Sequence, residues 1–207
     1  PSQSKANGGK IVPSTAEQWD MARLLQKELE ALGMQEVSLS DKCVLTAHLP
    51  ANLPPDAPRV PAIGFCAHLD TVDVSLSPVV KPQRISYAGD DIVLNAEKNI
   101  VMRATEHPEL TPYVGQELIV TDGTSVLGAD NKAAIANIMT ALATLAGDPA
   151  LRHGEVYVAF VPDEECGLWG SKNMDFTKFP VDYAYTIDCC ALGEVVYETF
   201  NAGSAEI

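Results

Sequence analysis

The sequence predicts a layered α/β fold in which helices flank a β-sheet. Short apolar runs of strand length alternate along the chain with two longer segments that have helical periodicity. Polar residues that can bind a metal follow directly after several of these apolar runs. With 207 residues, 46% of them hydrophobic, the chain can bury a full core as one domain.

Two segments carry the helical pattern. In the first, Ser14 and Glu17 are spaced as a capping box, and apolar residues then recur at helical spacing until Gly33. This pattern predicts an amphipathic helix over about residues 14–32. A second helix is expected over residues 130–147, which have the same spacing of apolar residues and end on a glycine.

Strands are expected where short apolar and β-branched runs lie between turn signals. The run 63–67 is apolar throughout, which is typical of a central strand covered on both faces. Asp122-Gly123 predicts a tight turn between two strands, and the prolines within 51–61 predict a loop. Residues 75–115 indicate only loops and short edge pieces. The expected strands are 35–40, 42–49, 63–67, 117–121, 124–129, 155–161 and 184–187.

The amino-acid composition argues against some classes of binding partner and favours one cellular compartment. The chain has 28 acidic against 14 basic residues, a formal charge of −14, which argues against nucleic-acid binding. No apolar run approaches the roughly 20 residues that a membrane helix needs. Five scattered cysteines do not fit a disulfide framework, so a cytoplasmic location is expected. Vicinal Cys189 and Cys190 could form a soft-metal or redox site, but neighbouring strand residues point to opposite faces.

Side chains that can bind a metal stand at four junctions between a strand and a loop. Singly, each has an ordinary interpretation as a core histidine, a helix cap or a turn residue. Together at one sheet edge, the carboxylates would repel one another and become harder to ionise, unless cations lay between them. Imidazole and carboxylate ligands suit zinc, and also manganese or cobalt. The residues concerned are His68, Asp70, Asp130, Glu164, Glu165 and Asp188.

The spacing within two of these pairs suggests a division of roles. Residues two apart on an extended strand face the same way, so Asp70 can reach His68 and fix the tautomer of a metal-bound imidazole. In the adjacent pair Glu164-Glu165, one carboxylate can bind metal while its neighbour takes a proton from water.

Four separated segments resemble the peptidase T family, tripeptide aminopeptidases within the co-catalytic zinc peptidases that also include acylases and glutamate-type carboxypeptidases. The segments are GFCAHLDTVD, DGTSVLGADNKAAIANIMTALATL, VYVAFVPDEECG and YAYTIDCCALGEVVYETFNAGSAEI. The resemblance implies a three-layer catalytic domain with a mixed, mostly parallel β-sheet flanked by helices. It also implies that residues 1–207 form the N-terminal part of that domain, truncated before a lid domain and the C-terminal part.

By this resemblance, four of the residues would hold two zinc ions. His68 and Asp188 would bind one zinc. Asp130 would bridge the pair, and Glu165 would bind the second zinc. The family's second zinc also takes a histidine from the C-terminal part of the domain, so the second site would be incomplete in these 207 residues. The other histidines of the chain match no such block, and they are His48, His107 and His153.

The resemblance gives the other two residues a part in the reaction. Glu164 would be the general base, and Asp70 would orient His68. The family joins the bridging Asp to the next residue through a cis peptide, here Asp130-Asn131. The sequence departs from the family in having Asn131 in place of a second Asp and Cys189-Cys190 in place of glycines.

The implied activity is release of the N-terminal residue from tripeptides or other short peptides by di-zinc-activated water. The full-length protein could form a homodimer through its lid. Two alternatives stay open, namely a related di-zinc amidohydrolase (an acyl-amino-acid deacylase or a dipeptidase) and a fragment that is inactive in isolation. A serine hydrolase is disfavoured because the sequence has no G-x-S-x-G motif, and a phosphate-binding loop is also missing.

Overall fold

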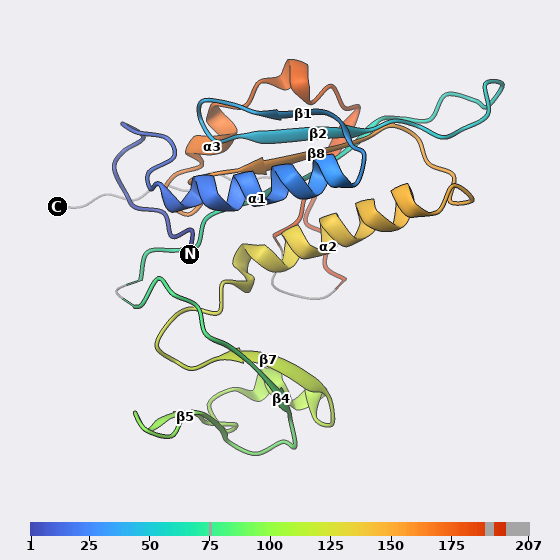
Figure 1. The fold of residues 1–207 in the computed structure, drawn as a ribbon. Helices are drawn as coiled ribbons and strands as arrows, with labels where there is room; N and C mark the ends of the chain where they lie inside the picture. Colours follow the sequence, from blue (N-terminus) through green and yellow to red (C-terminus); the bar gives the residue numbers. More distant parts are fainter. Residues whose placement is uncertain (75, 189–192, 198–207) are drawn as a thin grey trace.

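The fold is built on a five-stranded main sheet in the computed structural model, which describes residues 1–74, 76–188 and 193–197 (Figure 1). Its strands are β1 (Gln35–Leu39), β2 (Leu45–Leu49), β3 (Ile63–His68), β8 (Val156–Val161) and β9 (Tyr183–Thr186). They lie in the order β1-β2-β8-β3-β9, with β1-β2 and β2-β8 antiparallel and the other two pairs parallel. Only β2 therefore runs against the rest, which confirms a mixed, mostly parallel sheet.

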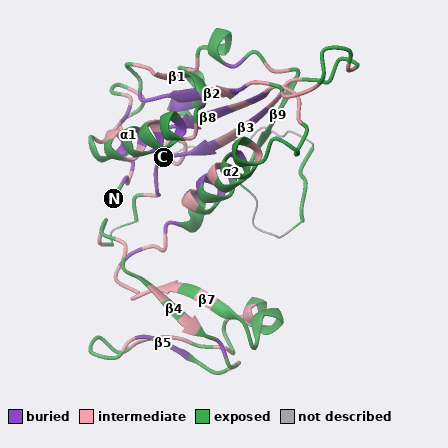
Figure 2. Ribbon diagram, turned by 45° about the vertical axis from the view of Figure 1, so that its right-hand side comes forward, coloured by how far each residue is buried: buried purple, intermediate pink, exposed green. Residues whose placement is uncertain are grey.

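Two long helices, α1 (Glu17–Ala31) and α2 (Ala129–Gly147), cover one face of this sheet (Figure 1, Figure 2). Their apolar side chains share one core with alternate residues of β2, β3 and β8, because alternate residues of a strand face the same way. Leu29 of α1, Leu142 of α2 and Phe160 of β8 are buried at its centre. Within the described residues, no helix is both long and apolar enough to cross a membrane.

The opposite face of the sheet is covered by the segment that links β8 to β9. This segment contains the short helix α3 (Trp169–Lys172) and the 3-10 turn η2 (Phe176–Lys178). Phe179, which follows η2, is buried against Gly64 of β3, where an added Cβ would lie only 2.2 Å from the Phe179 ring. A glycine in the middle of this strand therefore makes room for the third layer.

A smaller lobe lies between β3 and α2 in the sequence and stands apart from the main sheet (Figure 1, Figure 2). Its elements are β4 (Pro82–Ser86), β5 (Ile92–Asn95), β6 (Ile100–Met102), η1 (Pro108–Tyr113) and β7 (Glu117–Thr121). The strands pair as β4-β7 and β5-β6 and enclose a second core around Tyr87, Ile92 and Leu94. The loops and edge pieces expected for residues 75–115 thus include strands of their own, which do not join the main sheet.

The strand expected over residues 124–129 is wrong. The backbone N–H and hydroxyl of Thr124 both donate to the Asp122 carboxylate, and the Thr121 hydroxyl donates to the Ser125 carbonyl. These local side-chain bonds compete with strand pairing. Gly128, with φ +76, then turns the chain into α2. The Asp122-Gly123 turn is present, but it ends β7 without starting a second strand.

The capping box at the start of α1 is also wrong. The helix begins at Glu17, and its N-cap residue Ala16 makes no side-chain hydrogen bond. The hydroxyl of Ser14 instead donates to the carboxylate of Asp163, far away in the sequence. A tertiary contact has replaced the local one.

Candidate metal centre

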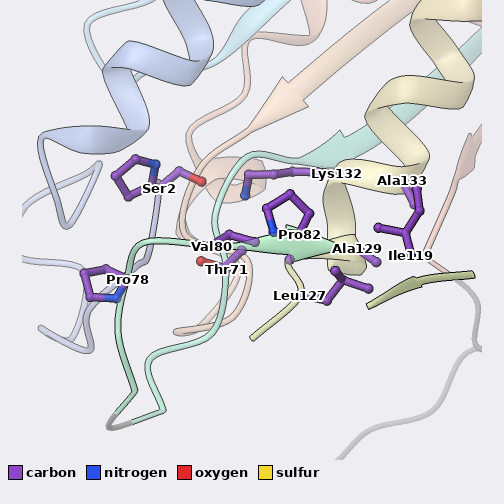
Figure 3. A pocket seen from close by; sticks show the side chains of 12 residues that line it. Ser2, Thr71, Pro78, Val80, Pro82, Ile119, Leu127, Ala129, Lys132 and Ala133 are labelled. Atoms are coloured by element: carbon purple, nitrogen blue, oxygen red, sulfur yellow. The ribbon is translucent and has the colours of Figure 1, made fainter. Parts of the chain in front are cut away.

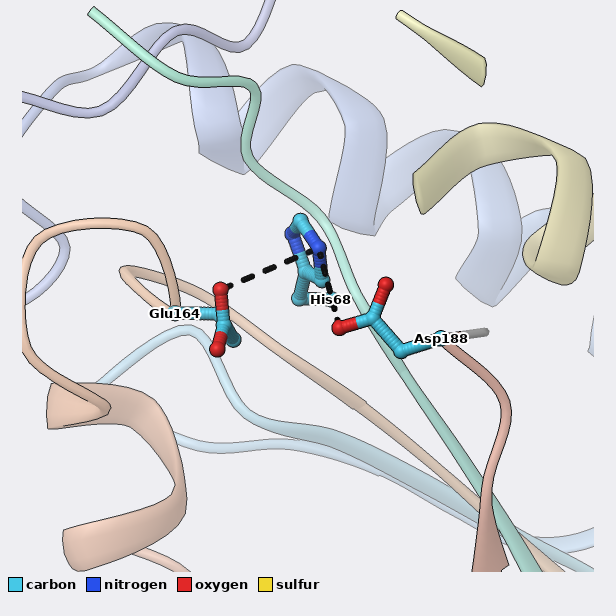
Figure 4. A group of neighbouring side chains, drawn as sticks. All are labelled: His68, Glu164 and Asp188. Carbon is cyan, nitrogen blue, oxygen red and sulfur yellow. Dashed lines mark ion pairs between the residues drawn. The ribbon is translucent and has the colours of Figure 1, made fainter. Parts of the chain in front are cut away.

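His68, the last residue of β3, forms the centre of the candidate site. Its side chain is only 2% exposed, and its Nε2 lies 2.9 Å from Oδ1 of Asp130. The same nitrogen lies 3.8 Å from Oδ2 of Asp188 and 3.9 Å from Oε2 of Glu164. Figure 4 shows the imidazole between the carboxylates of Glu164 and Asp188.

The sheet topology explains this convergence. β3, β8 and β9 are parallel neighbours, so their carboxyl ends meet at one edge. His68 ends β3, Glu164 and Glu165 follow β8, and Asp188 follows β9. Asp130 reaches the same edge from the first turn of α2, where Asp130 and Asn131 have non-helical backbone angles and are joined by a cis peptide.

Asp70 connects His68 to the loop that follows β8. Its carboxylate is fully buried and lies 3.3 Å from Nδ1 of His68. It also accepts hydrogen bonds from the backbone N–H groups of Glu164 (3.0 Å) and Glu165 (3.2 Å). Burial raises the pKa of Asp70, but these contacts outweigh it and leave the pKa below its usual range. Asp70 is therefore an ionised carboxylate that fixes both the imidazole and the loop.

The electrostatics of the cluster oppose ionisation of its other acids. Burial raises the pKa of Glu164, Glu165 and Asp188, and the negative charges of neighbouring carboxylates add to the effect. Burial lowers the pKa of His68, but the close contact with the Asp70 carboxylate and the charges of Asp70, Asp188 and Glu164 prevail and raise it to about 9. Bound cations would relieve this crowding of negative charge.

The donor atoms fit a divalent metal. His68, Glu164 and Asp188 form one group of potential ligands, and His68, Asp130 and Glu165 form another, with donor atoms within 4.8 Å of one another in each. The buried Nδ1 of His68 faces the Asp70 carboxylate, without a hydrogen bond of good geometry. The other ring nitrogen, Nε2, is therefore the one that is turned to the candidate metal ligands. One imidazole nitrogen can bind only one ion, so a second ion would have carboxylate ligands alone among the described residues.

The grouping of donors differs from the implied one. The resemblance places Glu164 outside the ligand set, whereas its carboxylate here shares a group with His68 and Asp188. Repulsion between acids is partly relieved by this closeness to the imidazole, since His68 lowers the pKa of Glu164. The structure thus brings all six expected residues to one edge, while their individual roles stay predictions. Cys189 and Cys190 lie outside the described residues.

Lys132 is a neighbour of the site that the sequence did not single out. Its Nζ donates to the Leu69 carbonyl at 3.4 Å. Its side chain lines a mainly apolar pocket with a volume of about 400 Å³ (Figure 3). Burial lowers the pKa of this amine, and the charges of Asp70 and Asp130 oppose that shift. The sequence signal that could have identified Lys132 is its position two residues after Asp130, a candidate metal ligand.

Comparisons with known proteins show which proteins this chain is similar to. The chain is 53% identical to a peptidase T-like protein of Yersinia pestis over 206 residues, which are 100% of this chain and 48% of the relative. It is 49% identical to the peptidase T of Alkaliphilus oremlandii over 94% of this chain and 47% of the relative. The chain is peptidase T-like. It spans about half the length of these curated relatives, and no family model matches it.

Solved structures support the fold of this peptidase T-like chain. A tripeptidase from Staphylococcus aureus superposes with a TM-score of 0.59 at 24% identity, over 92% of this chain and 40% of the other. The aminopeptidase PepT from Bacillus cereus gives a TM-score of 0.58 at 24% identity, over 84% of this chain and 42% of the other. The three-layer fold expected from the sequence is therefore confirmed.

Proposed function

We propose that the protein containing this chain is a metal-dependent aminopeptidase that releases the N-terminal residue of tripeptides or other short peptides. The observation that carries the proposal is the position of His68, whose Nε2 faces the carboxylates of Asp130, Asp188 and Glu164 at one sheet edge. The names of relatives that are about half identical to this chain over the aligned residues supply the reaction class.

The cofactor of this proposal is a pair of zinc ions per full-length subunit, which cobalt or manganese could replace in vitro. His68 and Asp188 would hold one ion, Asp130 would lie between the two, and Glu165 would hold the second. Such ions act as Lewis acids that polarise a carbonyl and make water more acidic. The second site needs a further ligand, so we propose that these 207 residues alone retain at most one tightly bound ion and have little activity.

Two residues of the chain would serve the reaction without holding metal. Glu164 would take a proton from the attacking water and pass it to the amine that leaves. Its half-buried carboxylate has a pKa raised by burial, so it accepts a proton more readily than an exposed glutamate does. Asp70 would keep His68 in one orientation and one tautomer, since its ionised carboxylate lies against Nδ1.

The proposal extends to the domain organisation, the oligomeric state and the location of the complete protein. Residues 1–207 would be the N-terminal part of the catalytic domain, followed by a lid and a C-terminal part, with a homodimer formed through the lid. A cytoplasmic location is consistent with the free thiols of Cys43, Cys66 and Cys166. Sedimentation of the complete protein tests the dimer, and cell fractionation tests the location.

The proposal is tested by incubating the complete protein with a free-amine tripeptide and with the N-acetylated form of the same peptide. We expect cleavage of the free amine, loss of activity on chelation, and recovery when zinc is restored. Cleavage of only the acetylated peptide would identify a deacylase. Full activity after complete removal of metal would contradict metal dependence.

A further inference from the structure

Asp163 precedes the Glu164-Glu165 pair and is fully buried, yet it belongs to neither group of potential metal ligands, and its carboxylate bonds the N-terminal segment. It accepts hydrogen bonds from the backbone N–H of Ser14 (2.7 Å) and from the Ser14 hydroxyl (2.6 Å). A third bond comes from Nε2 of Gln18, at 2.7 Å. The charge of this carboxylate is thus met by three donors from the region that begins α1.

Gln18 completes a two-point pairing with Asp163. Its side chain is fully buried, and while Nε2 donates to the Asp163 carboxylate, Oε1 accepts the backbone N–H of Asp163 at 3.1 Å. The partners fix the amide orientation, because only the oxygen can accept an N–H and only the NH2 can donate to a carboxylate. Pairing of this kind constrains both the side chain and the backbone of Asp163.

The backbone that this pairing holds is unusual. Asp163 has φ +56 and Leu168 has φ +59, both in the left-handed region that non-glycine residues seldom adopt. Between them the N–H groups of Glu164 and Glu165 point to Asp70. The loop is therefore fixed from two sides, by Asp70, which follows β3, and by Gln18 of α1. Conformations of this kind persist only where the surroundings impose them.

We infer that Gln18, supported by Ser14, is a positioning residue for the metal centre. By holding Asp163 in its left-handed conformation, it sets the direction in which the carboxylates of Glu164 and Glu165 leave the loop. This inference rests on the proposed function, because it assigns Gln18 the task of preparing a metal site. It also gives the first turn of α1 a role beyond packing.

An exchange of donor and acceptor separates this role from simple packing. Gln18→Glu sets a carboxylate against the Asp163 carboxylate and removes the donor at Nε2. The double variant Gln18→Glu/Asp163→Asn restores a two-point pair, because the new amide at 163 can donate to the new carboxylate at 18. Gln26→Glu is the matched control, since it makes the same change in α1 at a residue whose side chain bonds only the exposed Glu30. Gln18→Met, of similar volume, replaces Gln18→Glu should that variant fail to fold.

Two measurements on the complete protein test whether Gln18 positions the loop that carries Glu164 and Glu165. In the metal-free state, amide hydrogen exchange at residues 163–168 should accelerate about tenfold in Gln18→Glu, the size expected for one lost hydrogen bond. Zinc affinity should fall by about 10- to 100-fold, as for other residues that support metal ligands. Both should recover in the double variant, and Gln26→Glu should match the unmodified protein.

Unchanged exchange and affinity in Gln18→Glu would overturn the inference, and so would equal losses without recovery in the double variant. If the unmodified protein binds no zinc at all, the proposed function fails. Hydrogen exchange would still decide separately whether Gln18 holds the loop.

Discussion

The Asp70 carboxylate accepts the backbone N–H of Glu164 at 3.0 Å, so the residue that faces His68 also anchors the loop carrying the proposed general base. The imidazole and this loop are thereby held by a single fully buried side chain. A change at Asp70 should therefore disturb both the ligand and its neighbour at once.

The first prediction concerns Asp70→Asn. The amide keeps the size of the side chain but loses the charge and one of the two oxygens that accept the loop N–H groups. Zinc affinity, measured by isothermal titration, should fall by about 10- to 100-fold. Asp73→Asn is the control, because this carboxylate is exposed and accepts only from the Gln3 side chain. Equal affinities in Asp70→Asn and the unmodified protein would exclude a supporting role for Asp70.

The second prediction concerns proton release on metal binding. The surrounding carboxylates overcome the effect of burial and raise the pKa of His68 to about 9, so the metal-free imidazole is protonated at pH 7. A metal ion needs the unprotonated nitrogen, so binding at pH 7 should release about one proton. Affinity should accordingly rise as the pH increases from 7 towards 9. Titrations in two buffers with different ionisation enthalpies would show the release, and identical heats would refute it.

The third prediction concerns the segment that covers the face of the main sheet opposite α1 and α2. Gly64→Ala would place a Cβ 2.2 Å from the ring of Phe179 and force the ring to move. The free energy of unfolding should decrease by about 1–3 kcal/mol, the usual cost of overpacking. Gly147→Ala is the matched control, since nothing lies within 4 Å of the added Cβ. Denaturant unfolding curves of both variants would measure the difference, and equal stabilities would contradict the packing described for this face.

The candidate metal ligands were more predictable from the sequence than the residues that hold their loop in place. His68, Glu164 and Asp188 each follow an apolar strand, and parallel strands bring such positions to one edge whatever the details of packing. The Gln18–Asp163 pair joins residues 145 positions apart. Nothing local marks it, and Ser14 with Glu17 has an equally good local interpretation as a capping box.

In the smaller lobe, too, contacts between residues far apart in the sequence limit what the sequence can predict about the fold. β4 and β7 are short, and each is stabilised by the other across the intervening residues. Their own patterns therefore carry little of the signal that decides their pairing. The helices and central strands were predictable because long periodic segments and fully apolar runs specify their own burial.

The most direct test of the central claim is the rate of tripeptide hydrolysis by Glu164→Gln in the complete protein, measured together with its zinc content. Glu97→Gln, a change at an exposed acid of the smaller lobe, is the control for charge. If Glu164 transfers the proton, the variant should retain zinc and lose activity by about 100- to 10,000-fold. A zinc-loaded variant that hydrolyses the tripeptide at the unmodified rate would contradict the proposed mechanism.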